Sequence, residues 1–189
     1  MGALVSRVQG LCGRSRLRKA SIVIIGPSGS GKTTILYRLK LNETIKTVPT
    51  STYITETLDI FEDVSLLVWD VSLGAKGGPL KIHFLDNRQG FLYVVDSTDA
   101  TTFDDAREEL FYLVNRLTEH LPFIVLANKQ DLDGACSPSE LVHHLKLDKL
   151  ARRTCDVCGC SGVTGEGLRE ALEKLGKMIK ENEEQRQRR

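Results

Sequence analysis

The sequence has little that would place the protein across a membrane, outside the cell or on nucleic acid. Its 189 residues contain no apolar run long enough to cross a bilayer and no secretory signal. The 26 basic and 25 acidic residues nearly cancel, so the total charge does not indicate a nucleic-acid partner. Five cysteines without a secretory signal are typical of a reducing compartment. We therefore expect a cytoplasmic protein, and its length predicts one domain with its own core.

Metal-binding and catalytic side-chain patterns are also scarce. Cys155, Cys158 and Cys160 have a C-x₂-C-x-C spacing that lacks a fourth ligand, and Cys136 and His143-His144 are the nearby alternatives. Structural zinc sites are almost always four-coordinate, so this spacing argues against zinc. The histidines show no partner spacing for catalysis.

One motif carries most of the chemistry. Gly26-Pro-Ser-Gly-Ser-Gly-Lys-Thr33 fits the phosphate-binding pattern G-x-x-x-x-G-K-[ST], between an apolar run over Ser21–Ile25 and a helix predicted over Thr34–Lys40. Glycines let backbone N–H groups curl around phosphates, and the helix N-terminus directs its dipole at them. Lys32 can reach the β- and γ-phosphates, and the Thr33 hydroxyl can bind Mg²⁺. We therefore predict a nucleoside phosphate bound by Gly26, Pro27, Ser28, Gly29, Ser30, Gly31, Lys32, Thr33 and Thr34.

The apolar runs predict strands that alternate with helices. The strand candidates are Ser21–Ile25, Tyr53–Phe61, Val64–Asp70, Phe91–Asp96, Phe123–Asn128 and Thr154–Cys158. Glu62-Asp63 alone separates the second candidate from the third, so these two should form an antiparallel hairpin. The other gaps are long enough for crossover helices, which implies parallel pairing. We predict an α/β fold: a doubly wound, mostly parallel six-stranded sheet, with ligand at the carboxyl ends of its strands.

Three helices are predicted after the hairpin, two from apolar spacing and one from a capping box. Apolar residues recur at helical spacing over Phe103–Leu121 and again from Leu168 to Ile179. Ser137-Pro-Ser-Glu140 is a capping box with proline at the first helical position, and it opens a helix over Ser139–Leu145.

The segment Asn128-Lys-Gln-Asp131 indicates which base is bound. It directly follows a predicted strand, at the edge where the ligand should lie. The Asp131 carboxylate can accept hydrogen bonds from N1–H and the 2-amino group of guanine, and adenine offers neither donor. Asn128 can bond the other edge of the base, and the stem of Lys129 can cover its face. These residues favour guanine.

Two further segments fit a guanine nucleotide with magnesium. The backbone N–H groups of Cys160-Ser-Gly162, after the last strand, can meet guanine O6, which makes Ser161 and Gly162 predicted base contacts. The Asp70 carboxylate, at the end of a strand, can hold a Mg²⁺-bound water. We therefore expect GTP or GDP together with Mg²⁺.

With these segments in place, the chain resembles the Arf and Arf-like (ADP-ribosylation factor-like) small GTPases, which have a phosphate-loop G domain. The resemblance covers Met1 to about Lys180 and is carried by Gly26–Thr34, Val48–Thr50, Val68–Val71, Val94–Asp99, Leu126–Asp131 and Cys160–Leu168. It implies that Thr50 coordinates Mg²⁺ and senses the γ-phosphate. It also implies regulated membrane association, a guanine-nucleotide exchange factor, a GTPase-activating protein and effector proteins.

The second switch departs from the family pattern. After Trp-Asp-Val the family has Gly-Gly-Gln, and this chain has Ser72-Leu73-Gly74. Leu73 keeps the N–H that meets the γ-phosphate but lacks the φ freedom of glycine. Gly74 replaces the glutamine that orients the attacking water, and it has no side chain for that role. We predict very slow hydrolysis and assign no catalytic residue; Asn87 and Gln89 are the alternative carboxamides.

Three functions stay open at this stage. The first is a membrane-associated switch in trafficking or signalling that hydrolyses GTP slowly, and the second is a GTP-binding scaffold that hardly hydrolyses it. The third is a small-substrate kinase, because the phosphate loop with Pro27 is also similar to that of nucleoside monophosphate kinases. The segment Asn128–Asp131 argues against the kinase.

The N-terminus supports the membrane hypothesis. Met1–Ser6 matches the N-myristoylation pattern with Gly2 as acceptor, followed by apolar residues at helical spacing and a basic cluster up to Lys19. One acyl chain binds membranes only marginally, so the apolar face or the basic residues must help. We expect a monomer, peripherally associated with intracellular membranes through myristoyl-Gly2, with no nucleic-acid partner. Its predicted parts are a membrane-anchoring segment over 1–19, the G domain over 20–181 and a charged tail over 182–189.

Overall fold

The computed structural model describes residues 18–41, 53–61, 64–71, 78–117, 120–150 and 153–188. The strands are β1 (Arg18–Ile25), β2 (Tyr53–Phe61), β3 (Val64–Val71), β4 (Gly90–Asp96), β5 (Phe123–Asn128) and β6 (Cys155–Gly159). The helices are α1 (Lys32–Leu41), α2 (Gly78–Leu85), α3 (Phe103–Arg116), α4 (Pro138–His144) and α5 (Leu168–Gln187), with short 3₁₀ helices η2 (Ala100–Thr102) and η3 (Leu147–Leu150). Within these ranges, helices long and apolar enough to cross a bilayer are absent.

The strands form one sheet in the order β2-β3-β1-β4-β5-β6. The β2–β3 pair is antiparallel, and the other four pairs are parallel. This confirms the predicted α/β class, the six-stranded sheet and the hairpin around Glu62-Asp63. Strand β1 lies between β3 and β4, and both of its faces are covered. This central position explains why residues 22–25 are all β-branched and apolar.

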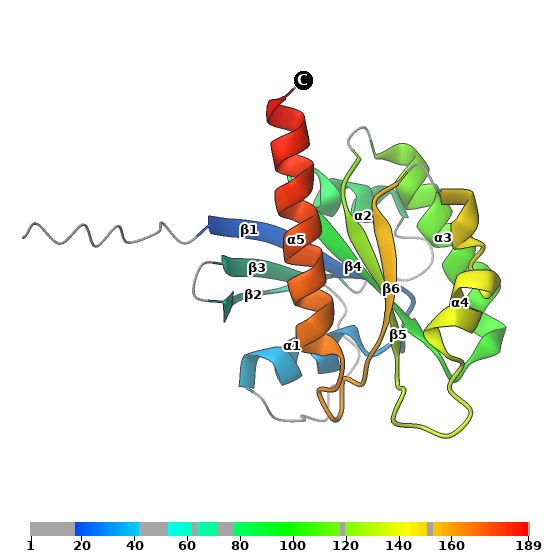
Figure 1. Cartoon of the computed structure of the whole chain (residues 1–189). Helices are drawn as coiled ribbons and strands as arrows, with labels where there is room; N and C mark the ends of the chain where they lie inside the picture. The colour runs from blue at the N-terminus through cyan, green and yellow to red at the C-terminus, as the bar shows by residue number, and fades with distance from the viewer. Residues whose placement is uncertain are drawn as a thin grey trace, which may run out of the picture.

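Alternation along β1 divides the core into two layers. Ile22 and Ile24 belong to the cluster formed with α1 and α5, whereas Val23 and Ile25 belong to the cluster formed with α2, α3 and α4. Successive side chains of a strand point to opposite faces, so a single apolar run serves both layers. Figure 1 shows the resulting arrangement, with α5 crossing the near face of the sheet and α3 and α4 lying on its other side.

A charged side chain is buried where α2 meets the sheet. Lys81 of α2 pairs with Glu109 of α3, and both are largely covered. The hydroxyl of Tyr93 in β4 hydrogen-bonds Glu109 Oε2 at 2.9 Å and donates to the Ala106 carbonyl at 2.8 Å. Burial, assisted by the Glu109 charge, raises the pKa of Tyr93 well above its usual value. These contacts fix α2, the helix that follows residues 72–77, against α3 and β4.

The largest differences from the predicted boundaries lie at the start of β1, which begins at Arg18 rather than Ser21, and at the end of α3. The helix predicted over Phe103–Leu121 ends at Arg116, because Leu117 is extended (φ −68°, ψ 122°). Pro122 disfavours a helical residue before it, and the chain has to turn before β5 begins. The charged tail predicted over 182–189 is helical as far as Gln187, where α5 ends. In Figure 1 this end of α5 extends beyond the sheet.

The fold brings four loops to one edge of the sheet. Strands β1, β4, β5 and β6 run parallel, so the segments that follow them leave at the same, carboxyl edge. Ligands of open α/β sheets bind at this edge. Residues 26–31, 97–99, 129–137 and 160–167 are therefore the candidates for a site.

Candidate nucleotide-binding site

The phosphate loop contains three glycines in left-handed conformations, and at two of them a side chain would also clash. Gly26, Gly29 and Gly31 have φ values of 146°, 77° and 94°. A Cβ at Gly26 would lie 2.2 Å from the Val94 carbonyl oxygen, and a Cβ at Gly31 would lie 2.3 Å from Asn128 Nδ2. The glycines thus serve the packing of the loop between β4 and β5 as well as its curvature.

Lys32 lies inside this loop. Its side chain is 4% exposed, and its Nζ donates to the Pro27 carbonyl oxygen at 2.7 Å. Burying an ammonium group is costly unless hydrogen-bond acceptors surround it. The Pro27 carbonyl, which belongs to the loop itself, is one such acceptor. The Ile35 N–H donates to the Gly31 carbonyl at 2.9 Å, which shows that α1 begins directly at the loop. The arrangement suits a phosphate, which would meet both the ammonium and the amino end of α1.

Asn128 joins the phosphate loop to the last loop of the site. Its carboxamide is 2% exposed. Nδ2 donates to the Ser30 carbonyl at 2.7 Å, and Oδ1 accepts the Gly162 N–H at 2.9 Å. The thiol of Cys160 lies 3.7 Å from the same Oδ1. The Asn128 carboxamide therefore holds the phosphate loop and the loop that contains Gly162 in position. The sequence predicted only a contact between Asn128 and the base.

Lys129 is held by an acidic residue at the end of the neighbouring strand. Its backbone is left-handed (φ 70°), and its Nζ pairs with Asp96 at the end of β4. The N–H and hydroxyl of Thr98 donate to the other oxygen of Asp96 at 3.0 and 2.7 Å. Burial alone would raise the pKa of Asp96, but the bonds from Lys129 and Thr98 outweigh it and lower this pKa. The lysine stem is thereby fixed beside the predicted base position.

Asp131 lies on the exposed tip of the turn that follows β5. The turn is anchored by the Gln130 N–H, which donates to the Cys160 carbonyl at 3.1 Å, and by the Leu132 N–H, which donates to Lys129 at 3.0 Å. Burial above all, together with Cys158 and Asp131, raises the pKa of the Cys160 thiol to about 12. Because Asp131 is exposed, its carboxylate is accessible at the carboxyl edge of the sheet, as the predicted contact with guanine requires.

The loop over residues 160–167, which we call the base loop, adds a condition to the prediction. The N–H groups of its first three residues already have protein acceptors: Cys160 donates to Ala127, Ser161 to Glu166 and Gly162 to Asn128, all within 3.0 Å. A contact between Ser161 or Gly162 and guanine O6 would share one of these groups. Both contacts stay predictions.

Several predicted site residues lie outside the described part of the chain. These are Gly2, Thr50, Leu73 and Gly74. Asp70 is described by its backbone alone, which pairs with Ile24 of β1 close to the carboxyl edge. The phosphate-loop residues 26–31 lead directly into Lys32, Thr33 and Thr34 at the start of α1, and their contacts with phosphate and Mg²⁺ stay predictions.

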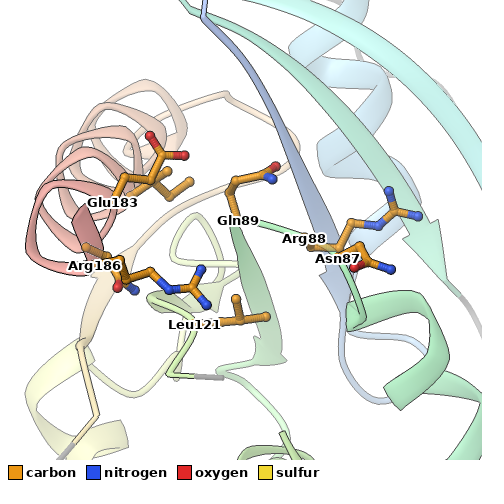
Figure 2. A pocket seen from close by; sticks show the side chains of 8 residues that line it. Asn87, Arg88, Gln89, Leu121, Glu183 and Arg186 are labelled. Atoms are coloured by element: carbon orange, nitrogen blue, oxygen red, sulfur yellow. The ribbon is translucent and has the colours of Figure 1, made fainter. Parts of the chain in front are cut away.

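A hollow of about 330 Å³ lies at the opposite, amino edge of the sheet. Figure 2 shows Gln89 between Glu183 and Arg186 of α5 on one side and Asn87 and Arg88 on the other. Gln89 accepts the Ser21 N–H at 2.6 Å, near the start of β1. The length of β4, about 20 Å at about 3.3 Å per residue, separates it from the phosphate loop. Asn87 and Gln89 are therefore excluded as substitutes for the missing glutamine.

Comparison with known proteins agrees with the site. The family model of the ADP-ribosylation factor (Arf) family matches residues 6–179. Among solved structures, the chain is similar to the Arl6 BBS3 small GTPase from Trypanosoma brucei, determined with the nucleotide analogue GppNp bound. The two are 26% identical with a TM-score of 0.76, over 87% of this chain and 99% of that one.

The fold and the site thus define a small GTPase of the GTP-binding switch class. The chain belongs to the ADP-ribosylation factor family, which implies that it binds guanine nucleotides.

Asn128→Ala should destabilise the protein even without nucleotide. The change leaves the buried Ser30 carbonyl and Gly162 N–H without their partner, at a cost of about 2 to 3 kcal/mol in the free energy of unfolding. Denaturant unfolding of nucleotide-free protein measures it. Asn182→Ala is the matched control, because that exposed carboxamide also donates to a carbonyl, that of His120 at 2.6 Å. An equal loss in both variants would contradict the positioning role of Asn128.

Proposed function

We propose that the protein is a guanine-nucleotide switch that binds GTP and GDP with Mg²⁺, hydrolyses GTP very slowly unaided, and associates peripherally with intracellular membranes. The observation that carries the proposal is the single carboxamide of Asn128, which holds the phosphate loop and the base loop together at the carboxyl edge. A nucleotide has a phosphate end and a base end, and this edge has a site for each.

Phosphates and metal belong to the first of these sites. Lys32 would contact the β- and γ-phosphates, and the N–H groups of residue 26 and residues 28–34 would surround them, joined by that of Leu73, since Pro27 has no N–H. Hydroxyl and carboxylate oxygens are the donors that Mg²⁺ prefers, which suits Thr33, Thr50 and, through a water, Asp70. The metal would neutralise phosphate charge, and the chain's own residues would hold the nucleotide in place.

Guanine belongs to the second site. The exposed carboxylate of Asp131 would accept the N1–H and 2-amino donors, and Lys129, fixed by Asp96, would cover the base. Asn128, Ser161 and Gly162 would shape the remaining edge. This arrangement supports a switch over a kinase, since the carboxylate distinguishes guanine from adenine.

Asp131→Asn should weaken guanine binding about a hundredfold, because two hydrogen bonds to a charged acceptor are lost. The same variant should gain affinity for xanthosine triphosphate, whose C2 oxygen can accept from the new amide. Competition binding of GTP, XTP and ATP measures both changes. Asp133→Asn, an exposed carboxylate two residues further on, is the control. Unaltered GTP affinity in Asp131→Asn would refute the assignment, and ATP binding as tight as GTP binding in the wild type would refute the guanine switch.

The second switch supports slow hydrolysis. Hydrolysis of GTP depends on positioning the attacking water and stabilising charge, and Gly74 has no group that positions water. An activating protein could supply what the chain lacks, while an exchange factor would release GDP and effectors would bind the GTP form. A scaffold that signals by binding alone is the second candidate, and Leu73-Gly74 is the feature that favours it.

Single-turnover hydrolysis by GTP-loaded protein should proceed at or below the order of 10⁻⁴ s⁻¹, the unaided rate of a GTPase that has the glutamine. Gly74→Gln alone should raise the hydrolysis rate only slightly, because Leu73 still restricts the loop. The double variant Leu73→Gly/Gly74→Gln should hydrolyse GTP faster than Gly74→Gln.

Two outcomes would change this account. A fast wild-type rate would contradict the prediction, and full recovery by Gly74→Gln alone would show that Leu73 leaves the loop unimpaired. Acceleration by cell extract would favour a regulated switch, and its absence would favour the scaffold.

Membrane association rests on Gly2 and on the basic residues that follow it. One myristoyl chain gives marginal, reversible binding, with an association constant of about 10⁴ M⁻¹, and basic residues add attraction to anionic lipid. Five of them lie within the first 19 residues: Arg7, Arg14, Arg16, Arg18 and Lys19.

N-myristoylated protein should sediment with vesicles that contain anionic lipid, and Gly2→Ala, which cannot be acylated, should lose most of this binding. Mass spectrometry of the cellular protein shows whether Gly2 carries the acyl chain. Neutral vesicles are the control, since they should retain less of the acylated protein. Equal binding of the wild type and Gly2→Ala would contradict the anchor.

A further inference from the structure

The base loop packs closely against α1, the helix that begins in the phosphate loop. A Cβ at Gly162 would lie 3.1 Å from Cγ1 of Ile35, and a Cβ at Gly165 would lie 3.3 Å from Cδ of Arg38. Ile35 and Arg38 are three residues apart on α1, so both lie on one face of the helix. The two glycines leave room for these side chains.

Arg38 also makes a hydrogen bond to this loop. Its Nη2 donates to the Val163 carbonyl oxygen. Val163 is 47% exposed, so the bond lies at the surface, on the outer end of the loop. A guanidinium presents several donors in a fixed plane, which lets one side chain hold a carbonyl while its stem packs on Gly165.

The bonds within the tip of the loop do not attach it to the domain. The N–H groups of Val163 and Thr164 donate to Ser161 Oγ at 3.1 and 2.9 Å, and the Gly165 N–H donates to the Ser161 carbonyl at 2.9 Å. Asn128 attaches the inner end of the loop, at Gly162. Arg38 attaches the outer end, and it does so from the helix that carries Lys32.

We propose that Arg38 is a positioning residue that ties the base loop to α1 and thereby slows nucleotide dissociation. The proposal rests on the proposed function, because Arg38 would act on the lifetime of the bound guanine nucleotide. It would do so through the base loop and without touching the nucleotide. With the tie in place, the phosphate half and the base half of the site move together. Without it, the base loop opens independently and the nucleotide leaves sooner.

The test compares Arg38→Ala and Arg38→Lys with the wild type. Removing a hydrogen bond from a charged donor should accelerate dissociation of GDP about tenfold in Arg38→Ala. Arg38→Lys should fall between the two, because it keeps the charge and loses the planar donors. Fluorescent GDP, chased with excess GDP in the presence of Mg²⁺, gives the rates.

Amide hydrogen exchange provides a readout that general destabilisation would not reproduce. In Arg38→Ala the N–H groups of Val163, Thr164 and Gly165 should exchange faster, while those of β1 and β4 keep their rates. Arg169→Ala is the control, since this exposed arginine follows the loop and pairs with Glu173 at 3.1 Å. It should change neither quantity.

Two results would overturn the proposal: dissociation of GDP from Arg38→Ala at the wild-type rate, or unaltered exchange at residues 163–165. Faster exchange throughout the domain would also overturn it, because the effect would then be global. If the wild-type protein binds no guanine nucleotide, the proposed function fails by itself. Exchange at residues 163–165 then still decides whether Arg38 holds the loop.

Discussion

The buried carboxamide of Asn128 is the interaction on which the site depends. A carboxamide has both donors and an acceptor, so one side chain can satisfy the Ser30 carbonyl and the Gly162 N–H at once. A carboxylate would lack the donor, and an apolar residue would leave both groups unpaired in a position with 2% exposure. Because Asn128 ends β5, the sheet itself sets the distance between the two loops.

The parallel sheet explains why so few residues suffice. Strands β1, β4 and β5 end side by side, so the phosphate loop, Asp96 and Asn128 become neighbours without any long-range coincidence in sequence. Gly26 approaches the Val94 carbonyl because β1 and β4 are neighbouring strands, about 4.8 Å apart, and the loop that follows β1 places Gly31 against Asn128 at the end of β5, one strand further on. At Gly26 and Gly31 this crowding requires glycine independently of any phosphate.

The sequence predicts elements better than it predicts partners. Local patterns placed β2, β5 and the capped start of α4 correctly, because an apolar run or a capping box is complete within a few residues. The predicted end of α3 was wrong. Apolar residues continue at helical spacing as far as Leu121, but Leu121 is buried in a loop after the helix has ended. The tie made by Asn128 and the bond from Arg38 to Val163 escaped prediction, because each joins segments about 100 residues apart.

In the proposed function, binding and hydrolysis depend on different parts of this chain, and the departures from the family sequence concern hydrolysis. The groups that would hold phosphate and base are supported by strands or by α1, whereas Leu73-Gly74 lies in the second switch. The slow hydrolysis proposed above would leave nucleotide dissociation as the step that limits how long a bound state lasts. Contacts that restrain the loops, Asn128 on the inside and Arg38 on the outside, would then control the lifetime of the signal more than any catalytic group does. Exchange of nucleotide, rather than its cleavage, would be the regulated event.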